Sequence, residues 1–354
     1  MALRLGVVFG GRSVEHEVSV VSAMSVLREA DPARFDVVPF GVTRAGRWLT
    51  PDETRAQLAR GDAPYEKRME GDVPPLLARD AVLHEVRSLD AVFPLVHGHF
   101  GEDGTMQGML EMWELPYAGC AVAASAIAMD KSLQKQICEW AGLKVARSMT
   151  VRAADWRAEG ERIARCAESM VGYPAFVKPA TGGSSVGVSV ARSREDLVEA
   201  LEAAFRIDGK ALIEERIEGR EVECGVIASA ASPVGEVIPA GEFYDYRAKY
   251  LEDSARLVAP ADLPADVADA VRERAVAAFD AVDGGRGFAR IDFFVTPDGE
   301  IVLNEINTIP GFTPISMFPR LWGLAGVSYP DLITRLVDLG LERAQERRAR
   351  DAGR

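Results

Sequence analysis

The sequence predicts an α/β protein whose N-terminal part is a doubly wound, Rossmann-like domain. Apolar runs of strand length at residues 3–9, 35–42 and 91–96 alternate with segments that have helical periodicity. The first run is followed at once by Gly10-Gly11, and a helical pattern then extends through residues 20–27. A strand, a glycine turn and a helix in this order are typical of a parallel sheet that is covered by helices.

A helix with Met106, Leu110 and Trp113 on one face follows the third apolar run and completes this first domain, residues 1–122. Beyond it we expect a second unit and a short tail. The segment from Leu341 onward is rich in Arg and Glu, so we expect a frayed helix end or disorder there. The tail is placed at residues 346–354.

The second unit opens with a helix from Asp130 to Gly142 that carries Leu133, Ile137 and Trp140 on one face. Short apolar runs predict the strands that follow, and the period of residues 197–205 predicts an amphipathic helix. The predicted strands lie at 175–178, 186–190, 211–214 and 222–227, and a hairpin is predicted at 288–295 and 300–306 around Thr296-Pro-Asp-Gly299.

The charge balance excludes several classes of partner. Lys and Arg number 41 against 54 Asp and Glu, a formal net charge of −13, whereas a nonspecific binder of nucleic acid or anionic membrane needs a basic surplus. No apolar run approaches the ~20 residues of a membrane span, and the run at 5–9 is too short for a signal peptide, so we expect a cytoplasmic protein. Four widely spaced cysteines predict reduced thiols.

A glycine-rich loop lies between two of the predicted strands. Lys178 ends the first strand, and Thr181-Gly-Gly-Ser-Ser-Val-Gly187 precedes the second. Backbone N–H groups and hydroxyls in such a loop can follow a polyphosphate while the lysine supplies a positive charge. The pattern matches neither the P-loop nor the dinucleotide motif, and it also suits an ordinary turn.

The predicted C-terminal hairpin brings polar side chains together. Alternation places Arg290 and Asp292 on one face of the first strand, and Glu305 and Asn307 on one face of the second. If residues 296–299 form the loop, Arg290 lies opposite Glu305 and all four polar side chains share a face. The apolar residues expected to cover the other face are Ile291, Phe293, Val302 and Ile306.

Two carboxylates and an amide oxygen on one sheet face form a hard oxygen site that suits Mg²⁺, and Arg290 beside them can stabilise a developing negative charge. The same residues also suit a solvated sheet face with a cross-strand ion pair. The hairpin alone leaves both interpretations open.

Longer motifs favour the first interpretation. Lys131, Lys178, the run at 212–215, the hairpin carboxylates and Asn307 occur in an order that resembles the ATP-grasp fold. With five further motifs, the chain resembles the D-alanine–D-alanine ligase family from about Leu5 to Leu339. The motifs are Gly10-Gly-Arg-Ser-Val-Glu-His-Glu-Val-Ser19, His97-Gly-His-Phe-Gly-Glu-Asp-Gly104, Met129-Asp-Lys131, Phe243-Tyr-Asp-Tyr-Arg-Ala-Lys-Tyr250 and Asn307-Thr-Ile-Pro-Gly-Phe-Thr-Pro-Ile-Ser316.

The resemblance implies an ATP-grasp fold of two α+β subdomains after the N-terminal domain, placed at residues 123–220 and 221–345. It implies ATP-dependent ligation of two D-alanines through an acyl phosphate, for peptidoglycan precursor synthesis, by a homodimer without nucleic-acid or membrane partners. Two Mg²⁺ or Mn²⁺ ions would be held by Asp292, Glu305 and Asn307, with Glu305 shared. The ATP-binding residues that it implies are Lys131, Lys178, Gly183, Ser184, Ser185, Glu214, Glu215, Ile217, Glu221, Phe243, Lys249, Phe294 and Asn304.

The resemblance also implies catalytic and substrate-binding residues. Glu15 would lie beside the ammonium of the first D-alanine and form a linked trio with Ser184 and Tyr250. Arg290 and the backbone N–H of Gly311 would stabilise the tetrahedral oxyanion. The substrate-binding residues that it implies are Glu15, His97, Lys249, Tyr250, Arg290, Gly311, Ser316 and Met317.

Other functions remain open. One alternative function is that of another ATP-grasp carboxylate–amine ligase, such as a D-Ala–D-Ser ligase. A second is an inactive nucleotide-binding module, which is disfavoured because all of the residues expected for catalysis are present: Lys178, Arg290, Asp292, Glu305 and Asn307. Related ligases that use D-lactate carry a histidine in the loop that ends at Tyr250, and this chain has no histidine after His99, so we predict D-alanine as the second substrate. We expect the long loop at 242–260 to close over the nucleotide.

Overall fold

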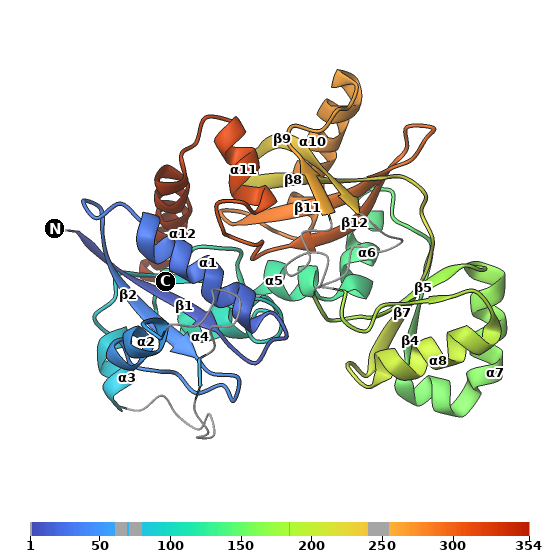
Figure 1. Ribbon diagram of the computed structural model, residues 1–354, viewed down its shortest axis with the longest axis horizontal. Coiled ribbons are helices and arrows are strands. Elements are labelled where there is room, and N and C mark those ends of the chain that lie inside the picture. Colours follow the sequence, from blue (N-terminus) through green and yellow to red (C-terminus); the bar gives the residue numbers. More distant parts are fainter. Residues whose placement is uncertain (1, 61–68, 71–79, 184, 240–254, 354) are drawn as a thin grey trace.

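The computed structural model describes residues 2–60, 69–70, 80–183, 185–239 and 255–353, and it has a mixed α/β fold. The strands of the described residues form three separate sheets. Figure 1 shows the first sheet in blue at one end of the molecule, the second in green at the other end, and the third in yellow and orange above and between them.

The first sheet is parallel, with strand order β2-β1-β3. Its strands are β1 (Leu3–Gly10), β2 (Phe35–Val42) and β3 (Ala91–Pro94), close to the predicted runs. Successive residues of β1 point to opposite faces of the sheet, and every residue of this strand from Leu5 on is buried. Both faces of the sheet are therefore covered and apolar. The helices associated with this sheet are α1 (His16–Glu29), α2 (Pro51–Leu58), α3 (Asp80–Val86) and α4 (Thr105–Met112).

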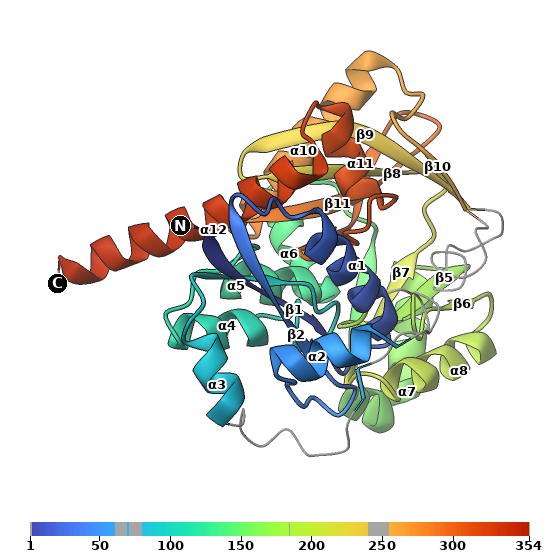
Figure 2. The same cartoon turned by 60° about the vertical axis from the view of Figure 1, so that its left-hand side comes forward.

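The C-terminal helix α12 (Tyr329–Ala352) returns to this first sheet. Its residues Leu332 and Leu336 share one hydrophobic core with Val7 of β1 and Val20 of α1. The opposite face of the sheet packs against α3 and α4. Figure 2 shows the last turns of α12 extending beyond the body of the protein.

The prediction of a frayed or disordered segment from Leu341 onward is wrong, because α12 is helical as far as Ala352. Arg286 pairs with Glu342 and Glu346 at 2.6 and 2.5 Å. Arg343 also donates to the backbone carbonyl of Tyr117 at 2.9 Å. The charged residues that suggested disorder therefore anchor the helix to two neighbouring segments.

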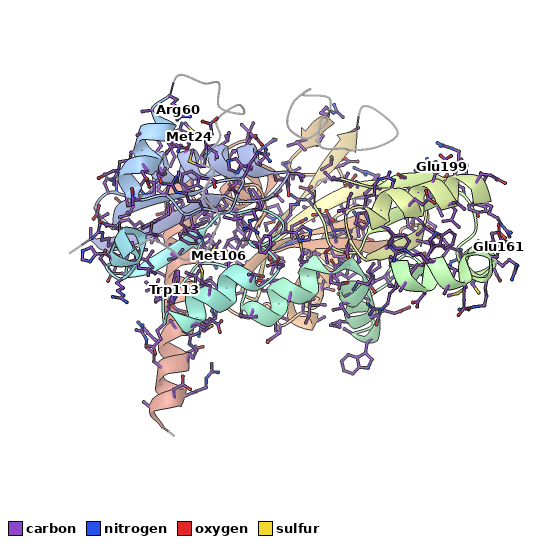
Figure 3. The ribbon with its side chains drawn as sticks, turned by 90° about the horizontal axis from the view of Figure 1, so that it is seen from below. Met24, Arg60, Met106, Trp113, Glu161 and Glu199 are labelled. Carbon is purple, nitrogen blue, oxygen red and sulfur yellow. The ribbon has the colours of Figure 1, made fainter. Side chains whose placement is uncertain are left out.

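The second sheet has strand order β4-β7-β5-β6, and all of its pairs are antiparallel. Two helices cover it, α7 (Ala153–Met170) and α8 (Arg194–Phe205), whose buried residues share a core with its strands. Figure 3 shows Glu161 of α7 and Glu199 of α8 at the outer end of this unit. The strands are β4 (Ser148–Arg152), which was not predicted, β5 (Ala175–Pro179), β6 (Ser189–Ala191) and β7 (Lys210–Glu215).

The third sheet is antiparallel, with strand order β10-β9-β8-β11-β12. One face packs on α10 (Ala265–Ala281). Part of the other face packs on α11 (Met317–Leu324), which comes close because Gly225 and Gly235 have no side chain: a Cβ on Gly225 would lie 2.9 Å from the Trp322 ring nitrogen. The strands are β8 (Arg220–Ile227), β9 (Ala230–Pro239), β10 (Ala255–Val258), β11 (Phe288–Val295) and β12 (Ile301–Asn307).

Helices α5 (Val122–Met129) and α6 (Lys131–Trp140) lie in the chain between the first and second sheets. The apolar face predicted for α6 points outward: Leu133 is 44% exposed and Trp140 is 90% exposed. The buried face instead carries Ser132, Gln134, Lys135 and Cys138. The side of α6 that faces the protein therefore supplies mainly polar groups.

Two predictions about the chain as a whole can be checked. None of the helices in the described residues is long and apolar enough to cross a membrane. All four cysteines are free thiols, as predicted. Burial raises the pKa of Cys120 and Cys224 to about 12, so neither is a reactive thiolate at neutral pH.

Candidate active site

A cavity of about 870 Å³ is lined by residues of the second and third sheets. Its walls combine apolar side chains such as Phe176 and Val190 with charged groups at Lys178 and Glu305. All of the predicted nucleotide-binding residues that the structure describes meet here. They are Lys131, Lys178, Gly183, Ser185, Glu214, Glu215, Ile217, Glu221, Phe294 and Asn304.

Two lysines bring positive charge to this cavity from different elements. Lys131 is the first residue of α6, and its Nζ donates to the backbone carbonyl of Gly182 at 2.8 Å and lies 3.4 Å from Glu305 Oε2. Lys178 is near the end of β5 and forms an ion pair with Glu214 of β7. The predicted lysines are thus close to the glycine-rich loop and to the hairpin.

A third lysine, Lys135, was not predicted and completes a buried row of charges. It forms an ion pair with the second oxygen of Glu214, so the carboxylate lies between two ammonium groups. Burial alone would raise the pKa of Glu214, but Lys178 and Lys135 outweigh it and lower the pKa to about 2. The available signal was helical spacing, because Lys135 is four residues after Lys131 and shares its face.

The hairpin has the predicted polar face but a different register. Arg290 lies opposite Asn307, and Asp292 lies opposite Glu305, so the predicted pairing of Arg290 with Glu305 is wrong by two residues. The strands are joined by five residues, 296–300, one more than predicted. The longer loop alone would shift the pairing by one residue and turn the two polar groups to opposite faces. A bulge that leaves out Asn304 shifts the pairing by one more.

The bulge restores the polar face and changes one apolar assignment. Arg290, Asp292, Glu305 and Asn307 share a face, as predicted. On the distal side of the bulge, Val302 pairs with Phe294 and Leu303 pairs with Phe293. Leu303, not Val302, therefore joins the apolar face, and Val302 lies on the other one.

Arg290 and Asp292 form the buried centre of this polar face. Arg290 Nε and Nη2 donate to the two Asp292 oxygens at 2.7 Å each, and Asn307 Nδ2 donates to Asp292 Oδ2 at 3.0 Å. Glu223, which is opposite Asp292 on β8, lies 3.2 Å from Arg290 Nε. Burial would lower the pKa of Arg290, but Asp292 and Glu223 outweigh it and raise the pKa well above its usual value, so the guanidinium stays charged.

Glu223 is a residue that sequence reasoning missed. It is 3% exposed, and the alternation of Glu221 and Glu223 along β8 was the signal that could have found it. Because the two strands pair in register, any polar residue at this position faces the same side as Arg290 and Asp292.

A second group of polar residues gathers where α1 begins. Glu15 precedes the first helical residue and is 7% exposed. A Cβ on Gly98 would lie 3.8 Å from Glu15 Oε2, and a Cβ on Gly183 only 2.6 Å from it. The glycine-rich loop thus approaches Glu15 closely because position 183 has no side chain.

His97 lies near Glu15 and is neutral at neutral pH. Burial lowers the pKa of this imidazole, and the opposing charge of Glu15 does not offset it. Nδ1 donates to the carbonyl of Ile309 at 2.8 Å. Nε2 is then an acceptor that is buried without a hydrogen-bond partner among the described residues.

Glu102 was also missed, and it ties two loops together. The backbone N–H groups of Gly98 and Ile309 donate to its two oxygens at 2.6 and 3.0 Å. Burial, and secondarily the charge of Glu15, raises the pKa of Glu102 to about 8. The carboxyl therefore links the loop of His97 to the loop that leads to Gly311.

Glu102 leads to a prediction about pH. Between its ordinary pKa of 4.5 and about 8 the folded protein binds a proton that the unfolded chain does not, so the contribution of Glu102 to the free energy of unfolding decreases as pH rises through this range. Glu102→Gln stays neutral at every pH. Its melting temperature relative to the wild type should therefore rise from pH 5.5 to pH 8.5 in thermal unfolding, and a constant difference between the two proteins would contradict the assignment.

The predicted residues after the hairpin have different surroundings. Ser316 Oγ accepts from the backbone N–H of Thr313 at 3.1 Å, and a Cβ on Gly311 would lie 3.1 Å from Ser316 Oγ. The side chain of Met317 is buried with Val237 and Leu321 in a small apolar cluster. Met317 therefore packs α11 on the third sheet, and only its backbone is available to a substrate.

Four predicted site residues lie outside the described residues: Ser184, Phe243, Lys249 and Tyr250. Most of the loop predicted to close over the nucleotide, at 242–260, lies outside them as well. In the part of the chain that is described, no three His, Cys, Asp or Glu side chains form a group that could hold a metal ion. The oxygen donors on the polar face are Asp292, Glu305 and the amide of Asn307.

Two family models account for most of the chain. The D-ala D-ala ligase N-terminus matches residues 4–120, and the D-ala D-ala ligase C-terminus matches residues 137–338. The chain belongs to the D-alanine–D-alanine ligase family. The family predicted from the motifs is thereby confirmed.

Relatives in this family match the chain over almost its whole length. The D-alanine–D-alanine ligase of Geobacillus kaustophilus is 43% identical over 356 residues, which cover 98% of this chain and 97% of that protein. The D-alanine–D-alanine ligase A of Chromobacterium violaceum is 43% identical over 356 residues, which cover 97% of this chain and 96% of that protein.

Solved structures in the family have a similar fold. The D-alanine–D-alanine ligase from Coxiella burnetii has a TM-score of 0.81 at 32% identity and covers 98% of this chain and 96% of its own. The VanG D-Ala:D-Ser ligase from Enterococcus faecalis has a TM-score of 0.80 at 33% identity and covers 96% of this chain and 100% of its own. These likenesses confirm the mixed α/β class.

Proposed function

We propose that this protein uses ATP to join two D-alanines into D-alanyl-D-alanine, for peptidoglycan precursor synthesis. The observation that carries the proposal is one cavity whose walls bring the lysines and the glycine-rich loop of one sheet to the polar hairpin face of another. Membership of the D-alanine–D-alanine ligase family supports the choice of reaction.

ATP suits the two kinds of group that line the cavity. Lys131 and Lys178 supply ammonium groups that can bind phosphates, and Gly182, Gly183 and Ser185 of the glycine-rich loop supply backbone N–H groups. Apolar side chains, among them Phe176 and Phe294, line the same cavity and can pack against a purine ring. Arg216 and Ile217 follow the end of β7 and line the cavity, where their backbone can meet the edge of the base.

Asp292, Glu305 and Asn307 are the residues that we propose to hold two Mg²⁺ or Mn²⁺ ions. Carboxylate and amide oxygens are the donors that these hard cations prefer, and Asp292 and Glu305 are neighbours across β11 and β12. Bound ions would neutralise charge on the phosphate oxygens. Arg290 then remains beside Glu223 on the same face.

The reaction has two steps. The carboxylate of the first D-alanine attacks the γ-phosphorus, an O–P bond forms and the bond to ADP breaks. The amine of the second D-alanine then attacks the acyl carbon after losing its proton, and phosphate leaves. We assign Glu15 to the ammonium of the first substrate, and Arg290 with the N–H of Gly311 to the oxyanion. The neutral His97 offers Nε2 as an acceptor near Glu15.

Several other features belong to this proposal. We place an N-terminal doubly wound domain at residues 1–122, the two subdomains of an ATP-grasp fold at 123–220 and 221–345, and a tail at 346–354. Ser184 and Tyr250 complete the trio with Glu15, Lys249 and Ser316 bind the second carboxylate, and Phe243 contacts ATP. We also propose a cytoplasmic homodimer, which light scattering of the purified protein tests.

Phosphate release tests the function. The purified protein with ATP and Mg²⁺ should release phosphate when D-alanine is added, and mass spectrometry should find D-alanyl-D-alanine. D-serine and D-lactate competing with D-alanine at pH 7 test the acceptor; we expect the D-alanine product to dominate because the chain has no histidine after His99. Dominant D-alanyl-D-serine would favour a D-Ala:D-Ser ligase, and ATP binding without release would indicate an inactive module.

A further inference from the structure

Glu214 is held between two lysines that approach it from different sides. Lys178 contacts one carboxylate oxygen and also lines the large cavity. Lys135 contacts the other oxygen and does not line that cavity. Lys135 and Glu214 are 3% and 4% exposed, so both charges are almost completely removed from water.

Lys135 reaches Glu214 from behind the cavity wall. It lines a second, smaller cavity of about 320 Å³ together with Ser132, Gln136 and Thr150. Ala146 lines both cavities, so only a thin wall separates them. Lys135 therefore lies outside the space that a ligand of the large cavity would fill.

The buried ammonium of Lys135 is costly unless a negative charge accompanies it. Burial lowers the pKa of Lys135, and the attraction of Glu214 only partly offsets this effect. Replacement by an apolar side chain of similar length would avoid this cost. The position thus carries a charge whose clear partner is Glu214.

A nucleotide changes the surroundings of Glu214. Phosphates bound in the large cavity would attract the ammonium of Lys178, because Lys178 lines this cavity and opposite charges interact strongly where water is scarce. Lys135 is then the cation that remains beside Glu214. An unpaired buried carboxylate would take up a proton, and a protonated carboxyl can donate as well as accept a hydrogen bond.

We propose that Lys135 is a positioning residue that keeps Glu214 a pure hydrogen-bond acceptor for the base, so that the site selects a 6-amino purine over a 6-oxo purine. A carboxylate accepts a hydrogen bond from the exocyclic amine of adenine and repels the carbonyl oxygen of hypoxanthine. This inference rests on the proposed function to the extent that the large cavity binds ATP with its base near Glu214.

Nucleotide binding by four proteins tests the inference. Dissociation constants of ATP and ITP, which differ at the 6-position, are measured by calorimetry for the wild type, Lys135→Met, Lys135→Arg and the control Lys144→Met. Lys144 is also a lysine paired with a glutamate, Glu300 at 2.7 Å, but it lies on the surface. Thermal unfolding shows which variants are folded, and Lys135→Gln replaces Lys135→Met if that protein does not fold.

We expect the wild type to bind ATP more tightly than ITP. Lys135→Met should reduce the ratio of the ITP dissociation constant to the ATP dissociation constant about tenfold, the effect of losing a hydrogen bond to a charged group. Lys135→Arg should restore the ratio, and Lys144→Met should leave it unchanged. The inference is overturned if the wild type has no preference, if Lys135→Met weakens ATP and ITP equally, or if Lys135→Arg fails to restore the ratio.

The assay separates this inference from the proposed function. Binding is measured without D-alanine, so the expected ratios would stand even if D-alanine released no phosphate. Conversely, normal ligation with an unchanged ratio in Lys135→Met would leave the function intact and remove the role of Lys135.

Discussion

Arg290→Gln should lower kcat for D-alanine-dependent phosphate release by about 10²–10³. The guanidinium is buried on the polar face of the third sheet, and its raised pKa keeps it charged throughout the reaction. Glutamine retains hydrogen-bond donors but loses the positive charge that we assign to the oxyanion. The measurement is the rate of phosphate release at saturating ATP and D-alanine.

The interpretation depends on where the effect appears. If Arg290 acts mainly in the transition state, the dissociation constant of ATP should change much less than kcat. Because Asp292 and Glu223 lose their shared cation, we also expect a lower melting temperature, which unfolding measurements report separately. Arg286→Gln is the control, since Arg286 also pairs with two carboxylates but does so on the surface. Equal kcat values for the two variants would refute the role of Arg290.

Parts of the fold could be predicted because they depend on local pattern. The three strands of the first sheet are apolar runs flanked by turn residues. Such continuous apolar runs are typical of strands that are buried on both faces of a parallel sheet, as these strands are. The packing of α12 on this sheet depends on contacts between residues more than 300 positions apart, and no local pattern reports them. The charged end of α12 was misjudged for the same reason, because its partner Arg286 is distant in sequence.

The polar hairpin face could be predicted although its register could not. The side-chain period of two places Arg290 with Asp292, and Glu305 with Asn307, in any register. Whether the two pairs meet depends on loop length and on the bulge at Asn304, each of which shifts the faces by one residue. The two shifts add up to two residues, which keeps each side chain on its predicted face but changes the residue opposite Arg290.

The residues that the sequence did not point to are buried charges. An amphipathic pattern is normally interpreted with its apolar side inward, but α6 turns Lys135 inward and Trp140 outward. Glu102 and Glu223 are likewise buried, and each is explained only by a partner on another element. Such positions depend on tertiary contacts, which a single sequence does not report.

Glu305→Gln should raise the Mg²⁺ concentration for half-maximal activity at least about tenfold. This is the lower end of the loss of metal affinity seen when a group that supports a metal site is mutated. Glu305 is a good test of the proposed metal site because it is the more accessible carboxylate: its side chain is 23% exposed, against 3% for Asp292. Removing its charge should therefore affect metal binding more than folding. Electron paramagnetic resonance of Mn²⁺ with a non-hydrolysable ATP analogue measures the metal affinity directly.

The same substitution has an opposite expected effect on nucleotide binding without metal. Glu305 Oε2 lies 3.4 Å from Lys131 Nζ, so its neutralisation frees this ammonium for the phosphates and removes a repelling charge. Metal-free ATP should bind Glu305→Gln as tightly as the wild type or more tightly. Glu300→Gln, next to the same strand but paired with the surface residue Lys144, is the matched control. A lower metal affinity with preserved metal-free nucleotide binding is expected only of a residue that binds the ion. A Mn²⁺ affinity equal to that of the control would therefore exclude Glu305 as a metal ligand.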